Sequence, residues 1–191
     1  MNDDFGRLLV DSGAVRDGHF LLSSGLHSGR YFEKFRILER PELCVRFARV
    51  ITERFRDAGV SLVCGPTTGG AIVAYEVARQ LGVRCIIAEK ADSGRKIGRG
   101  FSITSADRVL IVDDVLTTGR SIKETLLALE ATGAKVVGFG VFVDRSSGVN
   151  FPVPFFGVYR EEVVNYQPES CPLCRAGIPL EMPGRGGKGG G

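Results

Sequence analysis

The sequence predicts an α/β fold in which helices flank a central, mainly parallel sheet. From residue 60 onward, short apolar strands alternate with helical segments, and the strands are almost continuously apolar. Such strands are typical of a parallel sheet that is covered on both faces. With 191 residues, of which 43% are hydrophobic and 25% charged, the chain has the size and composition of one globular domain.

The first 40 residues predict smaller elements ahead of this alternation. Apolar positions over 3–10 fit a short amphipathic helix. Two short strands are expected at 19–22 and 31–35, separated by a turn rich in Ser and Gly at 23–29. Pro41 then begins a helix that runs to about Ala58 with one apolar face.

The remaining elements follow the strand–helix alternation as far as residue 159. They are a strand at 60–64, a Gly-rich loop at 65–70, a helix at 71–81, a strand at 83–88, a mobile loop at 89–100, a strand at 108–112, a helix at 119–131, a strand at 134–143 and an edge strand at 155–159. Ligands of an open parallel sheet bind beyond the carboxyl ends of its strands, so the loops at 65–70, 113–121 and 144–148 are the first places to look.

Composition and charge exclude several classes of protein. A formal net charge of +3 is too weak to argue for nucleic-acid binding. No apolar run approaches the ~18 residues of a membrane span, and the acidic start lacks the apolar run of a signal peptide. We therefore expect a cytoplasmic protein. The Gly-rich tail at 183–191 cannot bury a core and is expected to be disordered.

The five cysteines suggest a reducing compartment. Cys44, Cys64 and Cys85 lie in apolar segments and are expected to be buried free thiols. Cys171 and Cys174 form a CxxC pair, but zinc would need two further ligands. The histidines, His19 and His27, lie far upstream and are not expected to form a ligand pair. A structural or incidental role is therefore favoured over a metal or redox role.

The segment at 109–121 carries the strongest functional signal. Four apolar residues lead into Asp113 and Asp114, and a Thr-Thr-Gly-Arg-Ser turn then precedes a helix. Backbone N–H groups, hydroxyls and a helix N-terminus in such a turn suit a phosphate monoester. The carboxylates would repel phosphate, but they suit the vicinal hydroxyls of a sugar or a Mg²⁺ ion. The segment therefore predicts a site for a phosphorylated sugar.

This segment resembles the motif with which type I phosphoribosyltransferases bind 5-phosphoribosyl 1-pyrophosphate (PRPP), namely four apolar residues followed by D-D-x-x-T-T-G. The resemblance implies the fold of that family, with a small N-terminal hood at about 1–40, a core at about 41–165 and a single domain at 1–182. It also implies that the acids contact the ribose hydroxyls and that the following turn binds the 5′-phosphate. The Gly-rich loop at 65–70 lies where the family has its pyrophosphate loop.

Within this family, the chain is most similar to the orotate phosphoribosyltransferases. Three segments carry the similarity: F-L-L-S-S-G-L-H-S-G-R-Y-F at 20–32, D-R-S-S-G at 144–148, and the basic segment at 88–101. The resemblance implies transfer of the phosphoribosyl group of PRPP to orotate, which gives orotidine 5′-phosphate and pyrophosphate. It further implies Mg²⁺ as cofactor, bound mainly through PRPP, and a homodimer in which the loop at 90–100 covers the neighbouring site.

The resemblance also implies roles for individual residues. PRPP binding is expected from Lys90, Asp113, Asp114, Val115, Leu116, Thr117, Thr118, Gly119, Arg120 and Ser121, pyrophosphate binding from Thr67, Thr68 and Gly69, orotate binding from Thr117 and Arg145, and catalysis from Lys90, Lys96, Asp113 and Asp114. The loop at 90–100 holds Lys90, Arg95, Lys96 and Arg99 against Asp92, so it can supply positive charge to the leaving group.

Two lysines that many family members carry are replaced here. Ser23 and Gly69 stand at those positions, so positive charge must come from elsewhere. Two other functions remain open, namely a phosphoribosyltransferase for a purine base or uracil, and a PRPP-sensing regulator without catalysis. Arg145 favours orotate, because a neutral base has no use for a buried guanidinium.

Overall fold

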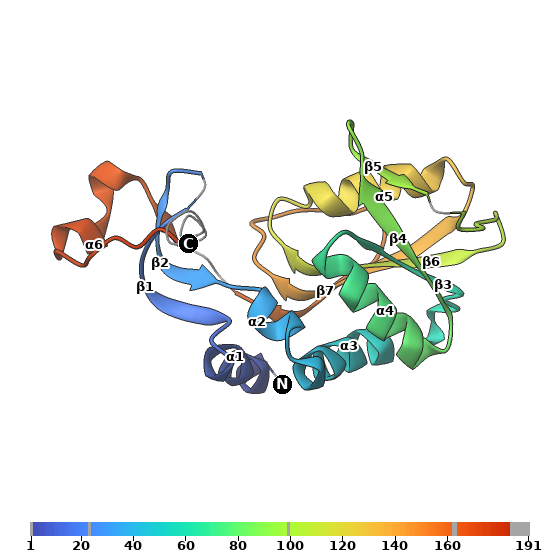
Figure 1. The fold of residues 1–191 in the computed structure, drawn as a ribbon, viewed down its shortest axis with the longest axis horizontal. Helices are drawn as coiled ribbons and strands as arrows, with labels where there is room; N and C mark the ends of the chain where they lie inside the picture. The colour runs from blue at the N-terminus through green and yellow to red at the C-terminus, as the bar shows by residue number, and fades with distance from the viewer. Residues whose placement is uncertain (1, 23, 99, 162–163, 184–191) are drawn as a thin grey trace, which may run out of the picture.

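The main sheet has six strands in the order β5-β4-β3-β6-β7-β8 (Figure 1). The computed structural model describes residues 2–22, 24–98, 100–161 and 164–183. The strands are β3 (Leu62–Pro66), β4 (Arg84–Lys90), β5 (Arg95–Ile97), β6 (Arg108–Leu116), β7 (Lys135–Asp144) and β8 (Phe155–Arg160). All neighbours in this sheet pair in parallel except β4 and β5, which pair antiparallel at one edge. The predicted α/β class is confirmed.

Helices cover both faces of this sheet. The helices α3 (Pro41–Phe55) and α4 (Gly69–Leu81) lie on one face, and α5 (Arg120–Glu130) lies on the other (Figure 1). Side chains of β6 serve the two faces in turn, because successive residues of a strand point in opposite directions. Leu110 and Val112 pack with α3 and α4, whereas Val109 and Ile111 pack with α5. This two-sided burial explains why the strand is continuously apolar.

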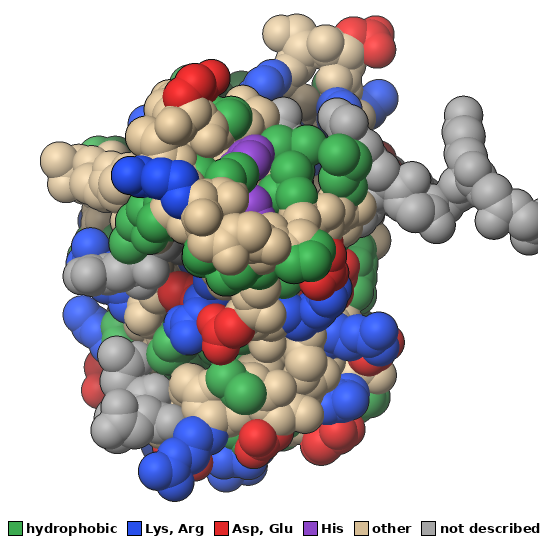
Figure 2. Space-filling model, turned by 90° about the vertical axis from the view of Figure 1, so that its left-hand side faces the viewer, with side chains coloured by type: hydrophobic (Ala, Val, Ile, Leu, Met, Phe, Trp, Pro, Cys, Tyr) green, Lys and Arg blue, Asp and Glu red, His purple; other side chains and the backbone are tan. Residues whose placement is uncertain are grey.

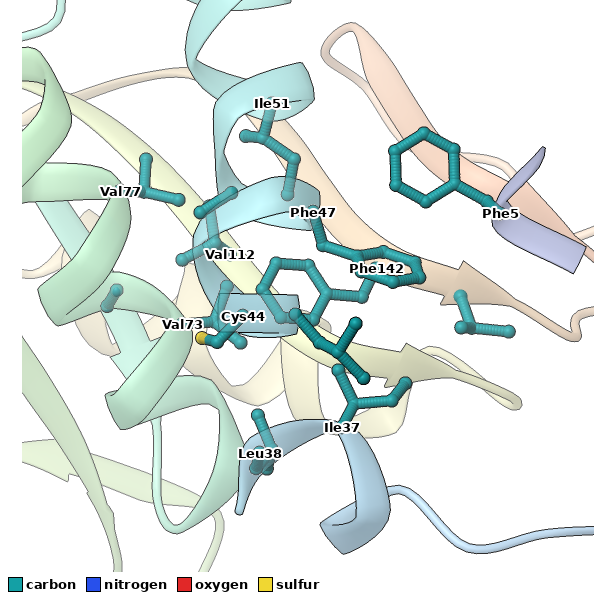
Figure 3. Close-up of a cluster of buried hydrophobic side chains, with 14 of the residues drawn as sticks. Phe5, Ile37, Leu38, Cys44, Phe47, Ile51, Val73, Val77, Val112 and Phe142 are labelled. Atoms are coloured by element: carbon teal, nitrogen blue, oxygen red, sulfur yellow. The ribbon is translucent and has the colours of Figure 1, made fainter. Parts of the chain in front are cut away.

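Phe47 of α3 is at the centre of the larger apolar cluster. Its ring is fully buried, with its centroid 4.6 Å from that of Phe5 and 5.2 Å from that of Phe142. Figure 3 shows these three rings together, with Ile51 on the same helix. Phe5 comes from α1 (Asn2–Asp11), so this cluster joins the first helix to the sheet.

The strand order places a crevice between β3 and β6. After β3 the chain adds β4 on one side of it, and β6 then pairs with its other side. The loops that leave β3 and β6 therefore diverge to opposite faces of the sheet, which creates the usual ligand crevice of an open α/β fold. The loops at 67–68 and 117–119 lie at this point.

A second, antiparallel sheet forms the hood. It contains β1 (Val15–Leu21), β2 (His27–Phe32) and the two-residue strand β9 (Asn165–Tyr166). Short helical turns complete the chain: α2 (Phe35–Leu38), η1 (Arg56–Ala58), η2 (Pro168–Ser170) and α6 (Pro172–Arg175). The C-terminal segment, residues 171–181, returns to β1, where Leu21 N–H donates to Glu181 O (2.9 Å). The strand β9 was not predicted, since two residues carry no periodic signal.

The predicted mobile loop at 89–100 is partly wrong. Residues 95–97 form β5, which makes a hairpin with β4 in which Lys90 pairs with Arg95. Main-chain pairing needs no apolar periodicity, so no pattern of side chains indicated this strand. Residues 184–191 of the predicted tail lie outside the described residues. Among the described residues, no helix is long and apolar enough to cross a membrane.

We expect Phe47→Ala to lower the free energy of unfolding by about 3–5 kcal/mol, because it removes a fully buried ring and leaves a cavity. Urea unfolding followed by circular dichroism measures this change. Leu127→Ala is the control: that side chain is 64% exposed, and we expect a change within about 0.5 kcal/mol. Similar losses in both variants would contradict this description of the core.

Candidate active site

Asp113 and Asp114 lie inside β6 rather than after it. The strand continues to Leu116, beyond the predicted end at Val112, and both carboxylates are buried. Backbone donors partly satisfy them: Asp114 N–H donates to Asp113 Oδ1 (2.9 Å), and Val115 N–H donates to Asp114 Oδ1 (2.7 Å). Adjacent buried carboxylates are costly, so they indicate a site that uses them.

The start of α4 packs directly against these acids. A Cβ atom at Gly69 would overlap the Asp114 carboxylate, and one at Gly70 would lie 2.8 Å from Asp113 Oδ1. Only glycine leaves room for the carboxylates at these two positions.

Lys34 supplies a cation that the sequence did not reveal. It lies between β2 and α2, and its Nζ is 3.0 Å from Asp114 Oδ2. The Lys34 side chain is 40% exposed, whereas that of Asp114 is 5% exposed. The charge thus reaches the acids from the hood side. A lone lysine between two elements has no motif that could have predicted this contact.

The pKa of the Asp113 carboxyl is raised to about 7, chiefly by burial and then by the charge of Asp114. Lys34 and the backbone N–H of Asp114 act in the opposite direction but do not offset the burial. A cation or a hydroxyl donor brought to this site would favour the ionised carboxylate.

A cavity of about 420 Å³ opens beside Asp113. It brings together nine of the predicted site residues: Lys90, Asp113, Val115, Leu116, Thr117, Thr118, Gly119, Arg120 and Ser121. Gly119 has a φ of 74°, which the turn into α5 requires, and α5 begins at the next residue. The exposed Thr117 and Thr118 precede this helix N-terminus, an arrangement suited to an anion.

Arg95 joins three parts of this cavity, although it was not among the predicted site residues. Its Nη2–H donates to Ser121 Oγ (2.9 Å), and its Nη1–H donates to Ala88 O (3.0 Å) and Thr67 Oγ1 (3.4 Å). Arg95 therefore connects the loop after β3 with the first turn of α5. The excess of positive charge at 90–100 was the available signal, but it did not distinguish Arg95 from its neighbours.

Only one of the two predicted loop lysines lines the cavity, although both line an outer groove. Lys90 lines the cavity that contains Asp113. Lys96 does not line it, and instead faces an outer groove together with Lys90, Asp92 and Ser93. Neighbouring side chains of β5 point to opposite sides, so Arg95 and Lys96 cannot both face the cavity. Arg99 lies outside the described residues.

Arg145 lies at the end of β7, apart from this cavity and under the hood. Its Nε is 3.5 Å from Oε2 of the buried Glu161, and its guanidinium lies 5.5 Å from the centroid of the Phe32 ring. Glu161 also binds Arg30, whose Nη1–H donates to Oε1 (3.2 Å). Burial lowers the pKa of Arg145. Its acidic neighbour is thus Glu161, which the sequence did not single out.

The remaining predicted residues lie near the crevice or outside the description. Thr67 contacts Arg95, Thr68 is exposed, and Gly69 is buried against Asp114. Ser23 lies outside the described residues. His19 and His27, which were expected to lie away from the CxxC pair, instead meet Cys171 and Cys174 at the far end of the hood.

Comparison with known proteins agrees with this geometry. The phosphoribosyl transferase domain family matches residues 36–170. The orotate phosphoribosyltransferase of Caldanaerobacter subterraneus is 46% identical over 89% of this chain and 90% of its own, and that of Pelotomaculum thermopropionicum is 45% identical over 95% and 96%. The crystal structure of the Aeropyrum pernix orotate phosphoribosyltransferase has 28% identity and a TM-score of 0.72, over 82% of this chain and 93% of its own. The chain therefore belongs to the phosphoribosyltransferases, and among these to the orotate phosphoribosyltransferase family.

We expect Asp113→Asn to stabilise the protein increasingly as the pH rises. The raised pKa means that the folded state holds this proton more tightly than the unfolded chain, whose aspartate titrates near ~4. The stability that this group contributes is present below about pH 4 and is lost as the pH rises through about 7. Melting temperatures at about pH 5.5 and about pH 8.5 should show the advantage of the variant over the native protein growing by about 5 °C.

The control is Asp57→Asn, which changes an exposed acid on η1. We expect its melting temperature to follow that of the native protein at both pH values. An Asp113→Asn advantage that is constant or shrinks with pH would contradict the assignment of a raised pKa to this carboxyl.

Proposed function

We propose that this chain transfers the phosphoribosyl group of PRPP to orotate, giving orotidine 5′-phosphate and pyrophosphate, as a step of pyrimidine biosynthesis. The observation that carries the proposal is one cavity that combines the buried acid Asp113 with a helix N-terminus and the cation of Lys90. The level of identity to the orotate phosphoribosyltransferases supports the choice of base. We also propose that residues 1–182 act as one domain.

PRPP is proposed to lie along the crevice with its charged ends apart. Its 5′-phosphate would accept hydrogen bonds from residues 117–121, where the hydroxyls of Thr117 and Thr118 precede the N-terminus of α5. Asp113 and Asp114 would accept hydrogen bonds from the ribose hydroxyls. In this arrangement the Lys34 ammonium would stay paired with Asp114 Oδ2 while the sugar binds.

The leaving pyrophosphate needs positive charge, because negative charge builds on it as the bond to C1′ breaks. Lys90 lines the cavity and Arg95 lies beside Thr67, so both are suited to contact it. Mg²⁺ is proposed to bind mainly through the oxygens of PRPP itself, and it would neutralise part of the charge on the leaving group. The oxygen-rich surroundings of Asp113 fit such a hard cation.

Orotate is proposed to bind between the hood and the core. Arg145 would pair with the carboxylate of orotate, and Thr117 would contact its ring. Arg145 is held by Glu161 on its Nε side and lies over the ring of Phe32, so its guanidinium has a fixed place. A purine base or uracil carries no carboxylate and would leave this charge unused.

The first experiment follows the ultraviolet absorbance of orotate with the purified chain, PRPP and Mg²⁺. We expect the signal to fall only when all three are present. Adenine, hypoxanthine, guanine, xanthine and uracil serve as competing bases. Turnover of one of these without turnover of orotate would replace the proposal, and PRPP binding without any turnover would favour a regulator.

We expect Arg145→Gln to raise the KM for orotate by about 100-fold, because the variant lacks the guanidinium proposed to pair with the orotate carboxylate. The KM for PRPP should change little. Steady-state kinetics with each substrate varied in turn measures both constants. Arg79→Gln is the control, since it changes an exposed arginine of α4 that pairs with Glu76. An unchanged KM for orotate in Arg145→Gln would remove this residue from the orotate site.

We further propose a homodimer in which the loop at 90–100 also reaches the neighbouring site. Lys90 lines the cavity of its own chain, whereas Lys96 faces outward. Lys96 is therefore the residue suited to act on a partner, and Lys90 the one suited to act within its own chain.

Mixing inactive variants tests whether Lys96 acts on the partner's site and Lys90 on the site of its own chain. Refolding Lys96→Ala together with Asp113→Asn should restore about a quarter of the native activity, because half of the random dimers then contain one intact site. Lys90→Ala together with Asp113→Asn should restore none, since both changes affect the same cavity. Equal recovery in the two mixtures, or recovery in neither, would contradict the proposed roles.

A further inference from the structure

Four side chains that suit a metal ion converge at the far end of the hood. His19 comes from β1, His27 from β2, and Cys171 and Cys174 from the C-terminal segment. One ligand atom from each residue lies within 4.8 Å of all the others. Figure 1 shows α6 at the opposite end of the molecule from α5 and β5, so this cluster is separate from the candidate active site.

The distances within the cluster match the edges of a metal-centred tetrahedron. His19 Nε2 is 3.5 Å from Cys171 Sγ and 3.7 Å from Cys174 Sγ, and His27 Nδ1 is 3.3 Å from Cys174 Sγ. Bond lengths of about 2.0–2.1 Å to nitrogen and about 2.3 Å to sulfur give an N···S edge of about 3.6 Å in tetrahedral zinc sites. The two ring nitrogens are 2.9 Å apart, close to the corresponding edge of about 3.3 Å.

A second contact prepares His19 as a ligand. Its Nδ1–H donates to Ile178 O (2.8 Å), which leaves Nε2 with the lone pair that faces the cluster. Metal-bound histidines in proteins commonly donate their other ring N–H to a carbonyl or carboxylate in this way. The C-terminal segment therefore supplies the thiols of Cys171 and Cys174 and also the Ile178 carbonyl that orients His19.

The backbone places all four residues without a long loop between them. The strands β1 and β2 pair so that Leu21 is opposite His27, which brings the two histidines to the same end of the hairpin. Cys171 precedes α6 and Cys174 lies within it, so the CxxC spacing directs both thiols to one side of a helical turn. His19, His27 and Cys171 are buried, and Cys174 is exposed.

We propose that His19, His27, Cys171 and Cys174 bind one zinc ion that fastens the C-terminal segment to the hood. Two thiolates and two imidazoles form a ligand set that zinc prefers, and four protein ligands leave no open position for a substrate. The ion would therefore be structural. This proposal does not depend on the reaction proposed for the other end of the molecule.

The hood has a structural need for such an ion. Its sheet contains three strands, one of them only two residues long, and neither large apolar cluster includes the residues at this end. A small sheet with so little apolar core has low stability in water, and small folds are often stabilised by a structural metal ion. Figure 2 looks onto this end and shows histidine atoms among hydrophobic side chains.

Metal content of the purified native chain is the first measurement. After expression in zinc-containing medium, mass spectrometry of metals should find about one zinc per chain. Cys174→Ser should reduce this to about one tenth or less, because a weakly binding hydroxyl replaces a thiolate. Cys85→Ser is the matched control: it removes a partly buried free thiol of β4 that is not part of the cluster, and it should keep the zinc.

Two readings on the native chain do not depend on any variant folding. Replacing zinc by Co²⁺ should give the visible absorption of a tetrahedral site with thiolate ligands, whose geometry Co²⁺ reports directly. Removing the metal with a chelator should lower the melting temperature by about 5 °C or more, and added zinc should restore it. Cys174→Ser should show neither the absorption nor the dependence on chelator.

The proposal is overturned if the native chain contains no zinc and binds none on addition. It is equally overturned if zinc content is the same in Cys174→Ser as in the native chain. A chain whose mass is lower by about two hydrogens and that carries a Cys171–Cys174 disulfide would assign the pair to redox chemistry instead. None of these outcomes bears on turnover of orotate, so failure here and failure of the proposed reaction are distinguishable.

Discussion

The burial of two adjacent carboxylates at the end of the central strand constrains the rest of the molecule. Asp113 and Asp114 can remain in β6 only because backbone N–H groups and the Lys34 ammonium compensate for lost hydration. They occupy the space that a Cβ atom at Gly69 or Gly70 would take, so the first turn of α4 lies directly against them. The acidic pair therefore contacts both α4, which packs against it, and Lys34, which connects it to the hood.

The positive charge of the site comes from two different elements. Lysines expected from the resemblance are replaced by Ser23 and Gly69. Lys34 approaches Asp114 from the hood, and Arg95 approaches Thr67 and Ser121 from the β4–β5 hairpin. Two elements distant in sequence, the segment before α2 and the β4–β5 hairpin, thus bring positive charge to the crevice.

The sequence predicted what local patterns encode. Apolar runs identified the parallel strands, and the acids followed by the Gly119 turn identified the crevice, because strand, turn and helix signals all lie within thirteen residues. It could not predict Lys34, Glu161 or β5, since each depends on a partner distant in sequence or on main-chain pairing alone. The same limit hid the histidine–cysteine cluster: eight residues separate His19 from His27, but 144 separate His27 from Cys171, and only the folded chain brings them together.

The strand β2 links the two ends of the hood. His27 at its start belongs to the histidine–cysteine cluster, whereas Phe32 at its end lies under Arg145. At ~3.3 Å per residue, His27 and Phe32 are about 17 Å apart along the strand. Arg30 on the same strand binds Glu161, which in turn lies against Arg145. The pairing of β2 with β1 therefore limits where Arg30 and Phe32 can lie, and with them the Glu161 and Arg145 side chains that they contact.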